Sequence, residues 1–310
     1  MAKYINPYTD FGFKKLFGEE GSKELLVDFL NQLLPPHHQI ANLNFSNSEI
    51  LPESEEDRKA FFDIHCIATS GERFIVEMQK AKVKHFKDRA LFYTTFPIKE
   101  QAKKGDWNFE LSAIYFIAIL DFYYDEKQEE AKFRRDVMLK DQDCEIFYDK
   151  LHFKFLQMPA FTKREFELET HFDKWAYFLK HLENFDDIPK ILNEPIFENA
   201  FKIAELAKFS SDQRLEYEKS RMTYLGVKAV ADTAEEQGEA KGFVKGEAKG
   251  KIEGKAEGLV EGEAKGIEKG LVEGEVKGVT KVAKSMKQKG VPFDEIEEFT
   301  GLSIEEIEKL

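Results

Sequence analysis

Three side chains, Asp63, Glu77 and Gln79, have the residue types and the spacing that could hold a divalent metal ion. They fall in the stretch 60–80, AFFDIHCIATSGERFIVEMQK, where apolar residues recur at every second position on both sides of a turn. That period of two predicts a β-hairpin with one apolar face against a core. The opposite face carries the three residues above together with His65.

The length of the turn decides whether the two carboxylates meet. A three-residue loop Thr69-Ser70-Gly71, with Gly71 in the left-handed region, would place Asp63 directly opposite Glu77. Opposed Cβ atoms of an antiparallel pair lie about 4.5–5.5 Å apart, so the carboxylates would repel, and Mg²⁺ would relieve that repulsion because it binds carboxylate oxygens. A two-residue turn would point the glutamate away from Asp63. The alternative to a metal site is two solvated carboxylates on an exposed sheet face.

Five pieces of the sequence resemble the PD-(D/E)XK nuclease superfamily, and they occur in the order found in its transposase-associated branch. The chain is similar to the recombination-promoting nucleases, or PD-(D/E)XK nuclease family transposases, over residues 1–125 and more loosely to about residue 230. This resemblance implies an α/β fold with a restriction-endonuclease-like core, a central mixed sheet flanked by helices, and a helical C-terminal extension. The pieces are NPYTDFGFKKLFG, FFDIHC, FIVEMQK, FKDRALFYTTFPIKEQAKKGDW and FELSAIYFIAILDF.

The same resemblance implies a metal-dependent DNA endonuclease that hydrolyses phosphodiester bonds. Asp63 and Glu77 would hold Mg²⁺, for which Mn²⁺ would substitute, and Gln79 would complete the catalytic set. Superfamily members often carry lysine where Gln79 stands, and glutamine can orient a water molecule but brings no positive charge. The alternative is a weak or inactive nuclease fold that acts as a nucleic-acid-binding or self-assembling interaction protein.

Basic residues follow the second strand of the hairpin. Between residues 78 and 104 lie eight basic side chains against two acidic ones, a local net charge of +6, although the whole chain carries −13. The overall charge argues against a protein that coats DNA broadly, but a local positive strip beside carboxylates suits a phosphodiester substrate. We therefore expect Lys80, Lys87 and Arg89 to bind DNA. For each lysine the alternative is a solvated lysine-rich helix face, whereas Arg89 would otherwise brace Asp63 or Glu77, or pair with a neighbouring acid of its own helix.

Three further residues are candidate accessory groups. Asp10 and Lys14 lie in the N-terminal piece, which family members can place near the metal, although Asp10 also suits the start of a helix. His65 would contact substrate or act as a base, and a hydrogen-bonded structural histidine is its alternative. Lys14 or Arg89 would have to supply the cation that the glutamine lacks, because Lys80 alternates to the opposite face of the strand.

Composition divides the chain into four parts, the third of which is unusual. In that part glycine recurs at every fourth position from Gly238 to Gly278, eleven times. Each glycine costs about 1 kcal/mol relative to alanine inside a helix, so an isolated helix would lose on the order of 10 kcal/mol. Either the segment is floppy, or its glycines let a second helix approach closely. We expect the second case, a helical arm that self-associates into a homo-oligomer. The parts are a nuclease-like core at 1–160, a helical accessory region at 161–234, the repeat arm at 235–280 and a small helical tail at 281–310.

Secondary-structure patterns place the hairpin within an α/β arrangement. A continuous apolar run within 110–122 indicates a strand buried on both faces. The other elements expected in the core are helices at 6–18 and 22–34, a strand at 40–50, a helix at 83–104 that Pro97 kinks or splits, and strands at 133–139 and 145–156.

Three features of the sequence bear on where the protein works. The N-terminus has no basic and apolar segments of a signal peptide, and the longest apolar run, Ala113–Leu120, is far shorter than the roughly 20 residues that span a bilayer. The two cysteines, Cys66 and Cys144, lack metal-ligand spacing, and Cys66 falls on the apolar face of the hairpin as a buried thiol. We expect a soluble, cytoplasmic protein without membrane contact.

Overall fold

The computed structural model describes residues 2–36, 38–46, 49–50, 60–102, 108–124 and 131–310. The chain forms two compact units, Met1–Ala234 and Glu235–Leu310. Lys103 and Lys104, the last two members of the predicted basic strip, lie outside the described residues. Within the described ranges, no helix is both long and apolar enough to cross a membrane.

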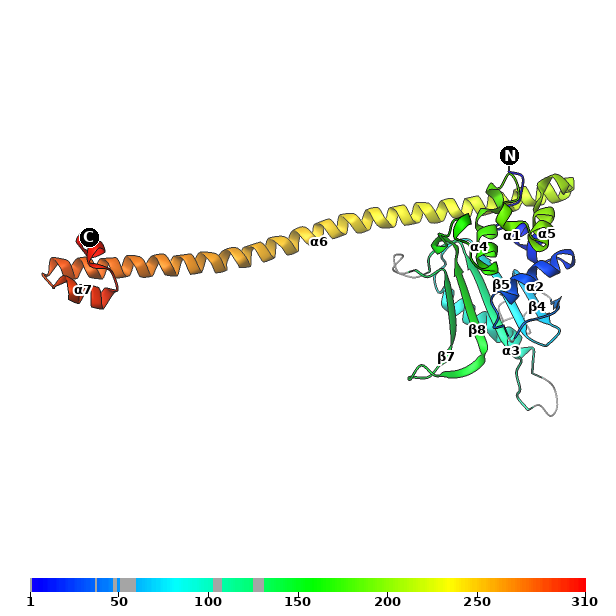
Figure 1. The fold of residues 1–310 in the computed structure, drawn as a ribbon, viewed down its shortest axis with the longest axis horizontal. Coiled ribbons are helices and arrows are strands. Elements are labelled where there is room, and N and C mark those ends of the chain that lie inside the picture. The colour runs from blue at the N-terminus through cyan, green and yellow to red at the C-terminus, as the bar shows by residue number, and fades with distance from the viewer. Residues whose placement is uncertain (1, 37, 47–48, 51–59, 103–107, 125–130) are drawn as a thin grey trace, which may run out of the picture. The chain divides into compact units, whose positions relative to one another are not determined.

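A mixed β-sheet forms the centre of the first unit (Figure 1). In the described residues it has six strands in the order β1-β4-β5-β6-β8-β7, and β2 and β3 form a separate two-stranded ladder. β5, β6 and β8 run parallel, whereas the pairs β1/β4, β4/β5 and β7/β8 are antiparallel. The strands are β1 Leu43–Phe45, β2 Glu49–Ile50, β3 Ala60–Phe61, β4 Ile64–Ala68, β5 Arg73–Gln79, β6 Ile114–Leu120, β7 Arg134–Lys140 and β8 Ile146–Gln157.

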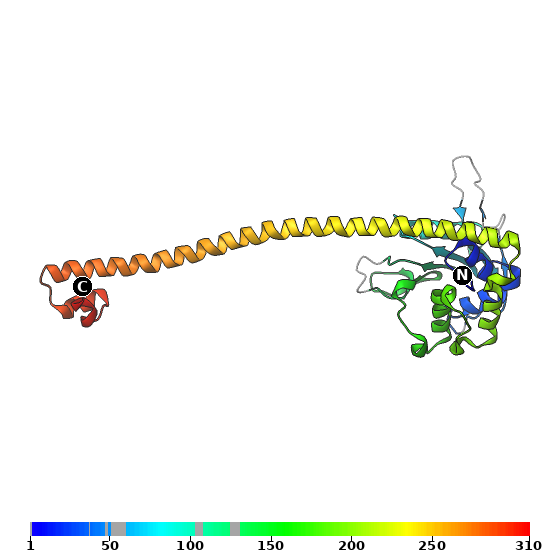
Figure 2. The ribbon, with the colours of Figure 1, turned by 90° about the horizontal axis from the view of Figure 1, so that it is seen from above.

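Helices cover both faces of this sheet, so the predicted mixed sheet with flanking helices and a helical C-terminal extension is confirmed. The core on one face takes side chains from α1, α2, α4, α5 and the start of α6, and the core on the other face from α3. Figure 2 shows the start of α6 running past the N-terminal helices. The α-helices are α1 Asp10–Phe17, α2 Lys23–Asn31, α3 Phe86–Lys99, α4 His171–His181, α5 Pro195–Ala204, α6 Ser211–Gln288, α7 Phe293–Thr300 and α8 Ile304–Glu308. Short 3-10 helices occur at Glu20–Ser22, Met158–Ala160, Glu165–Glu167, Leu182–Asn184, Lys190–Leu192 and Leu206–Lys208.

The hairpin of β4 and β5 has the register that a three-residue loop predicts. The amide of Ala68 donates to the carbonyl of Glu72 at 2.8 Å and closes the loop, in which Gly71 has a φ of +108°. Cys66 is paired with Phe74, as expected. A residue with a Cβ rarely adopts such a φ, so the glycine fixes the odd loop length and with it the face on which each side chain lies.

The two faces of the hairpin meet different surroundings. Cys66, Phe74 and Met78 belong to the larger core, whereas Phe62 and Ile75 belong to the core beneath α3. Burial raises the pKa of the Cys66 thiol to about 12, which confirms the prediction of a buried, unreactive cysteine. All residues of β6 are buried, which confirms a central strand covered on both faces.

Local capping shortens one predicted helix. The helix expected from residue 6 begins at Asp10, because Thr9 is extended and its hydroxyl accepts a hydrogen bond from the amide of Gly12 at 2.9 Å. A Cβ at Gly12 would lie 2.2 Å from the carbonyl oxygen of Asn6, so this close approach requires glycine.

Of the strand expected at 40–50, the described residues contain the short strands β1 and β2.

The helix after the hairpin also differs from its prediction. It was expected over 83–104 but begins at Phe86, because His85 has a φ of +60° and cannot continue a right-handed helix backwards. Pro97 does not split α3, which is one helix to Lys99. The proline lies in the last turn, where few backbone hydrogen bonds remain to be broken.

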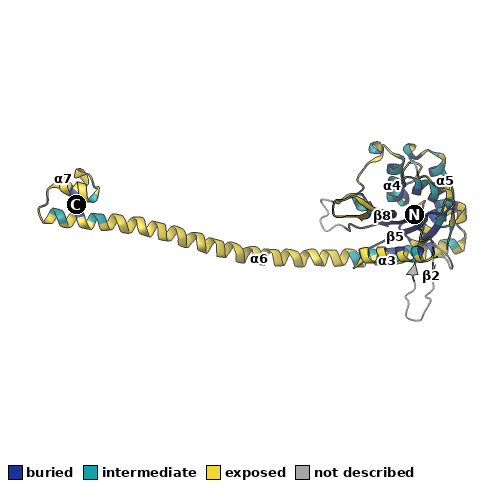
Figure 3. Cartoon of the chain, turned by 90° about the horizontal axis from the view of Figure 1, so that it is seen from below, coloured by how far each residue is buried: buried dark blue, intermediate teal, exposed yellow. Residues whose placement is uncertain are grey.

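The glycine repeat forms part of a helix, as predicted. α6 has 78 residues, and those after Ala234 belong to the second unit. Figure 3 shows the exposed residues along this part of the helix. In the described residues, no atom apart from the helix's own nearby backbone lies within 4 Å of the place where a Cβ would sit on any repeat glycine. Large apolar side chains there are exposed as well, among them Phe243, Ile252, Leu259 and Leu271.

The tail has a small core of its own. Ala283 at the end of α6, Ile296 of α7 and Ile307 of α8 pack together. Ser303 and Glu306 form a capping box at the start of α8, in which the Ser303 hydroxyl accepts from the amide of Glu306 and the glutamate side chain accepts from the serine amide.

Candidate metal centre

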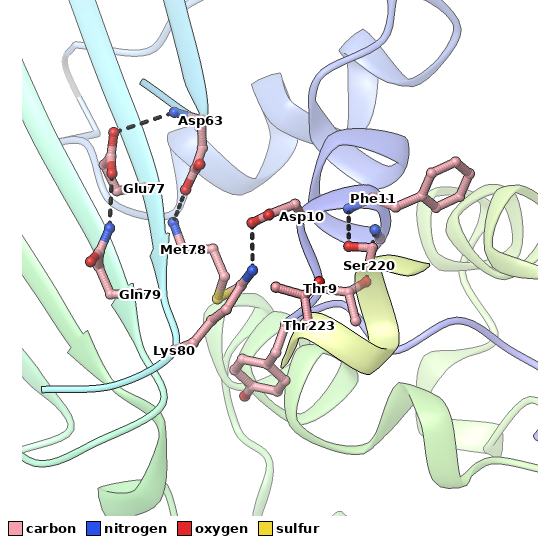
Figure 4. A network of polar contacts seen from close by, with 12 residues as sticks. Thr9, Asp10, Phe11, Asp63, Glu77, Met78, Gln79, Lys80, Ser220 and Thr223 are labelled. Atoms are coloured by element: carbon pink, nitrogen blue, oxygen red, sulfur yellow. Dashed lines mark hydrogen bonds and ion pairs between the residues drawn. The ribbon is translucent and has the colours of Figure 1, made fainter. Parts of the chain in front are cut away.

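Asp63 and Glu77 lie side by side across the hairpin (Figure 4). The amide of Asp63, one residue before β4, donates to Oε1 of Glu77 at 3.3 Å, and Oδ2 of Asp63 accepts from the amide of Met78 at 2.7 Å. Extended by one pair, the register of β4 and β5 sets Asp63 opposite Glu77. The juxtaposition predicted from the odd loop length is therefore present.

Burial perturbs both carboxyl groups. Glu77 is only 1% exposed. Burial, and then the charge of Asp63, raise the pKa of the Glu77 carboxyl to about 8. Burial also raises the pKa of the Asp63 carboxyl, and the negative charge of Asp10 raises it further. The hydrogen bond that Asp63 accepts from the Met78 amide and the positive charges of Lys14 and Lys80 act in the opposite direction. Two acidic groups thus share a site with too little positive charge for both to ionise freely at neutral pH.

Two polar side chains contact the buried glutamate. Nε2 of Gln79 donates to Oε2 of Glu77 at 2.9 Å. A guanidinium nitrogen of Arg89 lies 3.7 Å from the same oxygen, and the guanidinium carbon lies 4.9 Å from the ring centroid of Tyr93. The structure therefore brings the glutamine to the carboxylate pair and gives Arg89 the bracing position that its place on α3 suggested.

The N-terminal helix reaches the other side of the pair. Nζ of Lys80 forms an ion pair of 2.6 Å with Oδ1 of Asp10, at the start of α1. Lys80 therefore turns toward α1, whereas Glu77 contacts Arg89 of α3, as strand alternation predicts. The charge of Lys80 nevertheless acts on Asp63, as that of Lys14 does.

The remaining predicted residues differ in their placement. His65 is buried, and its ring packs edge-on against Phe62 at 5.6 Å between ring centroids. Lys87 is exposed on α3 with its ammonium group over the ring of Tyr124, at 5.3 Å. No described contact links Lys87 to the two carboxylates, so it is not part of the centre itself.

The chain also forms a cleft at this point, which the sequence does not indicate. A cavity of about 610 Å³ is bounded by α1, by the start of β4 and by the first turns of α6. Asp63 and His65 line it, and so do Lys14 and, from α6, Lys219. Helical periodicity shows that one face of α6 is buried but not which surface covers it, so no signal in the sequence could have found Lys219. We call this cavity the α1–α6 cleft.

The donor set fits a divalent cation that also uses water and substrate as ligands. Among the residues that the structure describes, no three His, Cys, Asp or Glu side chains are arranged to hold an ion. Mg²⁺ commonly needs only one or two protein carboxylates, because it keeps several waters and binds substrate phosphates. Asp63 and Glu77 supply oxygen donors at a place short of positive charge, which such an ion would provide.

A mixed sheet flanked by helices, with two acidic side chains meeting on a central hairpin, defines a restriction-endonuclease-like protein. A sequence model of the PD-(D/E)XK nuclease family transposases matches residues 7–234. The chain therefore belongs to this family, and the resemblance found in the sequence is confirmed. Nucleases of this superfamily typically use a divalent metal ion. No curated protein and no solved structure is similar enough to this chain to count as a match.

Proposed function

We propose that this protein is a metal-dependent DNA endonuclease that hydrolyses phosphodiester bonds, of the recombination-promoting, transposase-associated type. The observation that carries the proposal is the adjacent pair of the half-buried Asp63 and the buried Glu77, whose charge the protein itself does not balance. Perturbed carboxyl pairs of this kind are typical of functional sites, and family membership supplies the class of substrate.

In this proposal the two carboxylates hold Mg²⁺, which when bound would polarise the phosphate and lower the pKa of a water molecule. Gln79 is fixed through its amide nitrogen by Glu77, so its oxygen can accept a hydrogen bond from the attacking water. Arg89 keeps the glutamate in position, and the ammonium group of Lys80 offsets charge that builds on the phosphate. Lys87 would bind DNA further along α3.

Cleavage of plasmid DNA tests this function. Purified full-length protein should nick supercoiled plasmid with Mg²⁺ or Mn²⁺ and lose this activity in a chelator. Asp63→Ala should reduce nicking by roughly a thousandfold or more, because a metal ligand worth several kcal/mol of transition-state stabilisation is removed. The control is Asp88→Ala, which removes an exposed carboxylate from α3. Equal nicking by the wild type and Asp63→Ala would refute the proposal.

The missing lysine at position 79 leads to a prediction about pH. Because the pKa of Glu77 is about 8, metal binding to the wild type must displace a proton below that pH. Gln79→Lys would place an ammonium group where the amide now contacts Glu77, and an opposite charge at such a distance lowers a carboxyl pKa by roughly 1–3 units. The pH at which Mg²⁺ affinity reaches half its maximum should fall by that amount in isothermal titrations. Gln79→Met, which removes the hydrogen bond without adding charge, should raise that pH instead.

We also propose that the repeat arm assembles with a second copy of this chain. Its glycines leave open positions on the helix surface, and large apolar side chains in the same segment are exposed. Neither the glycines nor the exposed apolar side chains stabilise a lone helix. Glycines do, however, let two helices approach closely enough to pack.

A further inference from the structure

The wall of the α1–α6 cleft that α6 provides is held firmly to the rest of the first unit. The buried hydroxyl of Tyr217 accepts a hydrogen bond from the amide of Asn6 at 2.9 Å, and the hydroxyl of Ser220 accepts from the amide of Phe11 at 3.1 Å. One turn further, the hydroxyl of Tyr224 donates to the carboxylate of Asp121 at 2.9 Å. Side chains that α6 presents to the cleft are therefore fixed relative to Asp63.

Some charged side chains of this cleft form ion pairs, and others do not. Lys15 pairs with Glu19 at 2.8 Å, and Asp10 is paired with Lys80. Lys14 from α1 and Lys219 from α6 are exposed, and neither forms an ion pair with any residue that the structure describes.

The one acidic side chain that α6 adds to the cleft is Glu216, which is exposed. Two unpaired ammonium groups therefore approach the cleft from two different helices, and Asp63 lies between these walls. A chain of phosphates is the ligand chemistry that suits two separated lysines beside a metal-binding carboxylate.

We propose that the α1–α6 cleft receives one strand of the DNA backbone, and that Lys14 and Lys219 bind phosphates on either side of the phosphate that reacts at Asp63. This inference rests on the proposed function, because it uses that function to identify the centre at Asp63. A cleft of about 610 Å³ has the size of a small-molecule site, so it takes in a stretch of backbone and not the width of a duplex. Lys14 and Lys219 are then positioning residues, which set the register of the strand without touching the reacting atoms.

The salt dependence of DNA binding tests the inference without relying on cleavage. Fluorescence anisotropy of a labelled duplex with the full-length protein in chelator gives the slope of log affinity against log salt. Each phosphate contact contributes roughly 0.9 to that slope on duplex DNA. The double variant Lys14→Gln/Lys219→Gln should therefore lower its magnitude by roughly 1.8. The double variant Lys190→Gln/Lys202→Gln removes the same charge from two exposed lysines outside both the cleft and the basic strip, and should leave the slope unchanged.

Two neighbouring glutamates of α6 provide a second, matched comparison. Glu216 and Glu218 are both exposed, but only Glu216 lines the cleft. Glu216→Gln should tighten DNA binding severalfold because a charge that repels phosphate is removed, whereas Glu218→Gln should leave it unchanged. Melting temperatures should match the wild type for all these variants, because each replaces an exposed side chain.

The outcomes separate this inference from the proposed function. Binding that depends on Lys14, Lys219 and Glu216 in a protein that does not nick plasmid would uphold the cleft and refute the nuclease. Nicking by a protein whose salt slope is unchanged in Lys14→Gln/Lys219→Gln would refute the cleft and leave the nuclease standing. Equal effects of Glu216→Gln and Glu218→Gln, or no measurable DNA binding, would also overturn the inference.

Discussion

Glu77→Gln should make the metal-free protein more stable at pH 8 while it abolishes cleavage. The pKa of this carboxyl is about 8 in the folded protein, against an ordinary value of 4.5, so the folded state holds a proton that the unfolded state has released between these pH values. The wild type therefore loses stability as the pH rises through that window, by about 5 kcal/mol in total. Glutamine does not titrate in this range, so the stability of Glu77→Gln should not fall with pH in this way.

Thermal unfolding across a pH series measures this effect. At pH 5 the wild type and Glu77→Gln should melt at similar temperatures, because the glutamate of the folded wild type is then neutral. At pH 8 the variant should melt roughly 10–20 °C higher. Saturating Mg²⁺ should narrow that difference by stabilising the wild type, by about 2.7 kcal/mol at a hundred times its dissociation constant. Parallel melting curves over the whole pH range would show that the pKa of Glu77 is not raised.

Glu72 is a control of opposite sign on the same hairpin. Burial acts to raise its pKa, but hydrogen bonds from Ser70 and from His38, the latter at 2.6 Å, outweigh that effect and lower the pKa. Its ionised form therefore stabilises the folded protein above pH 4.5, and this contribution is lost as the pH falls below that value. Glu72→Gln should accordingly lower the melting temperature at pH 7 and leave plasmid nicking intact.

The hairpin could be predicted from sequence because two local rules agree there. Alternation of apolar residues sets the faces, and Gly71 sets the loop length, so the pairing of Asp63 with Glu77 follows from a short stretch alone. The same rule turned Lys80 to the other face, where it pairs with Asp10 of α1, but it could not show that the charge of this lysine still acts on Asp63. A local rule thus predicts the face of a side chain but not its partners on other elements.

The cleft lay beyond sequence reasoning for a different reason. Tyr217 and Tyr224 are spaced by two helical turns, which indicates a buried face on α6, but their hydrogen bonds go to Asn6 and Asp121, far away in the sequence. Only the folded arrangement shows that this helix carries Lys219 to the cleft that Asp63 lines. The starts of α1 and α3 escaped prediction because they depend on the cap at Thr9 and on the backbone angle of His85.

Filling the glycine positions of the arm should dissociate the assembled protein while it strengthens the isolated helix. A Cβ on Gly250, Gly254, Gly258 or Gly262 would meet no described atom outside the helix within 4 Å in a single chain. The fourfold change to alanine should therefore stabilise a lone helix by about 4 kcal/mol, at about 1 kcal/mol for each position. If a second helix packs against these glycines, the four methyl groups would instead hold the two backbones apart.

Light scattering and circular dichroism on the same samples separate these two effects. The wild type should have the mass of an oligomer, and the fourfold variant should have the mass of one chain with at least as much helix. Gly226→Ala is the matched control, because it adds a methyl group at an equally open position of α6 outside the repeat and should leave the oligomer intact. A wild type that is monomeric, or a fourfold variant that still assembles, would contradict packing through the glycines. The glycines would then act against helix formation, and the arm would be a helix held at the margin of its stability by composition alone.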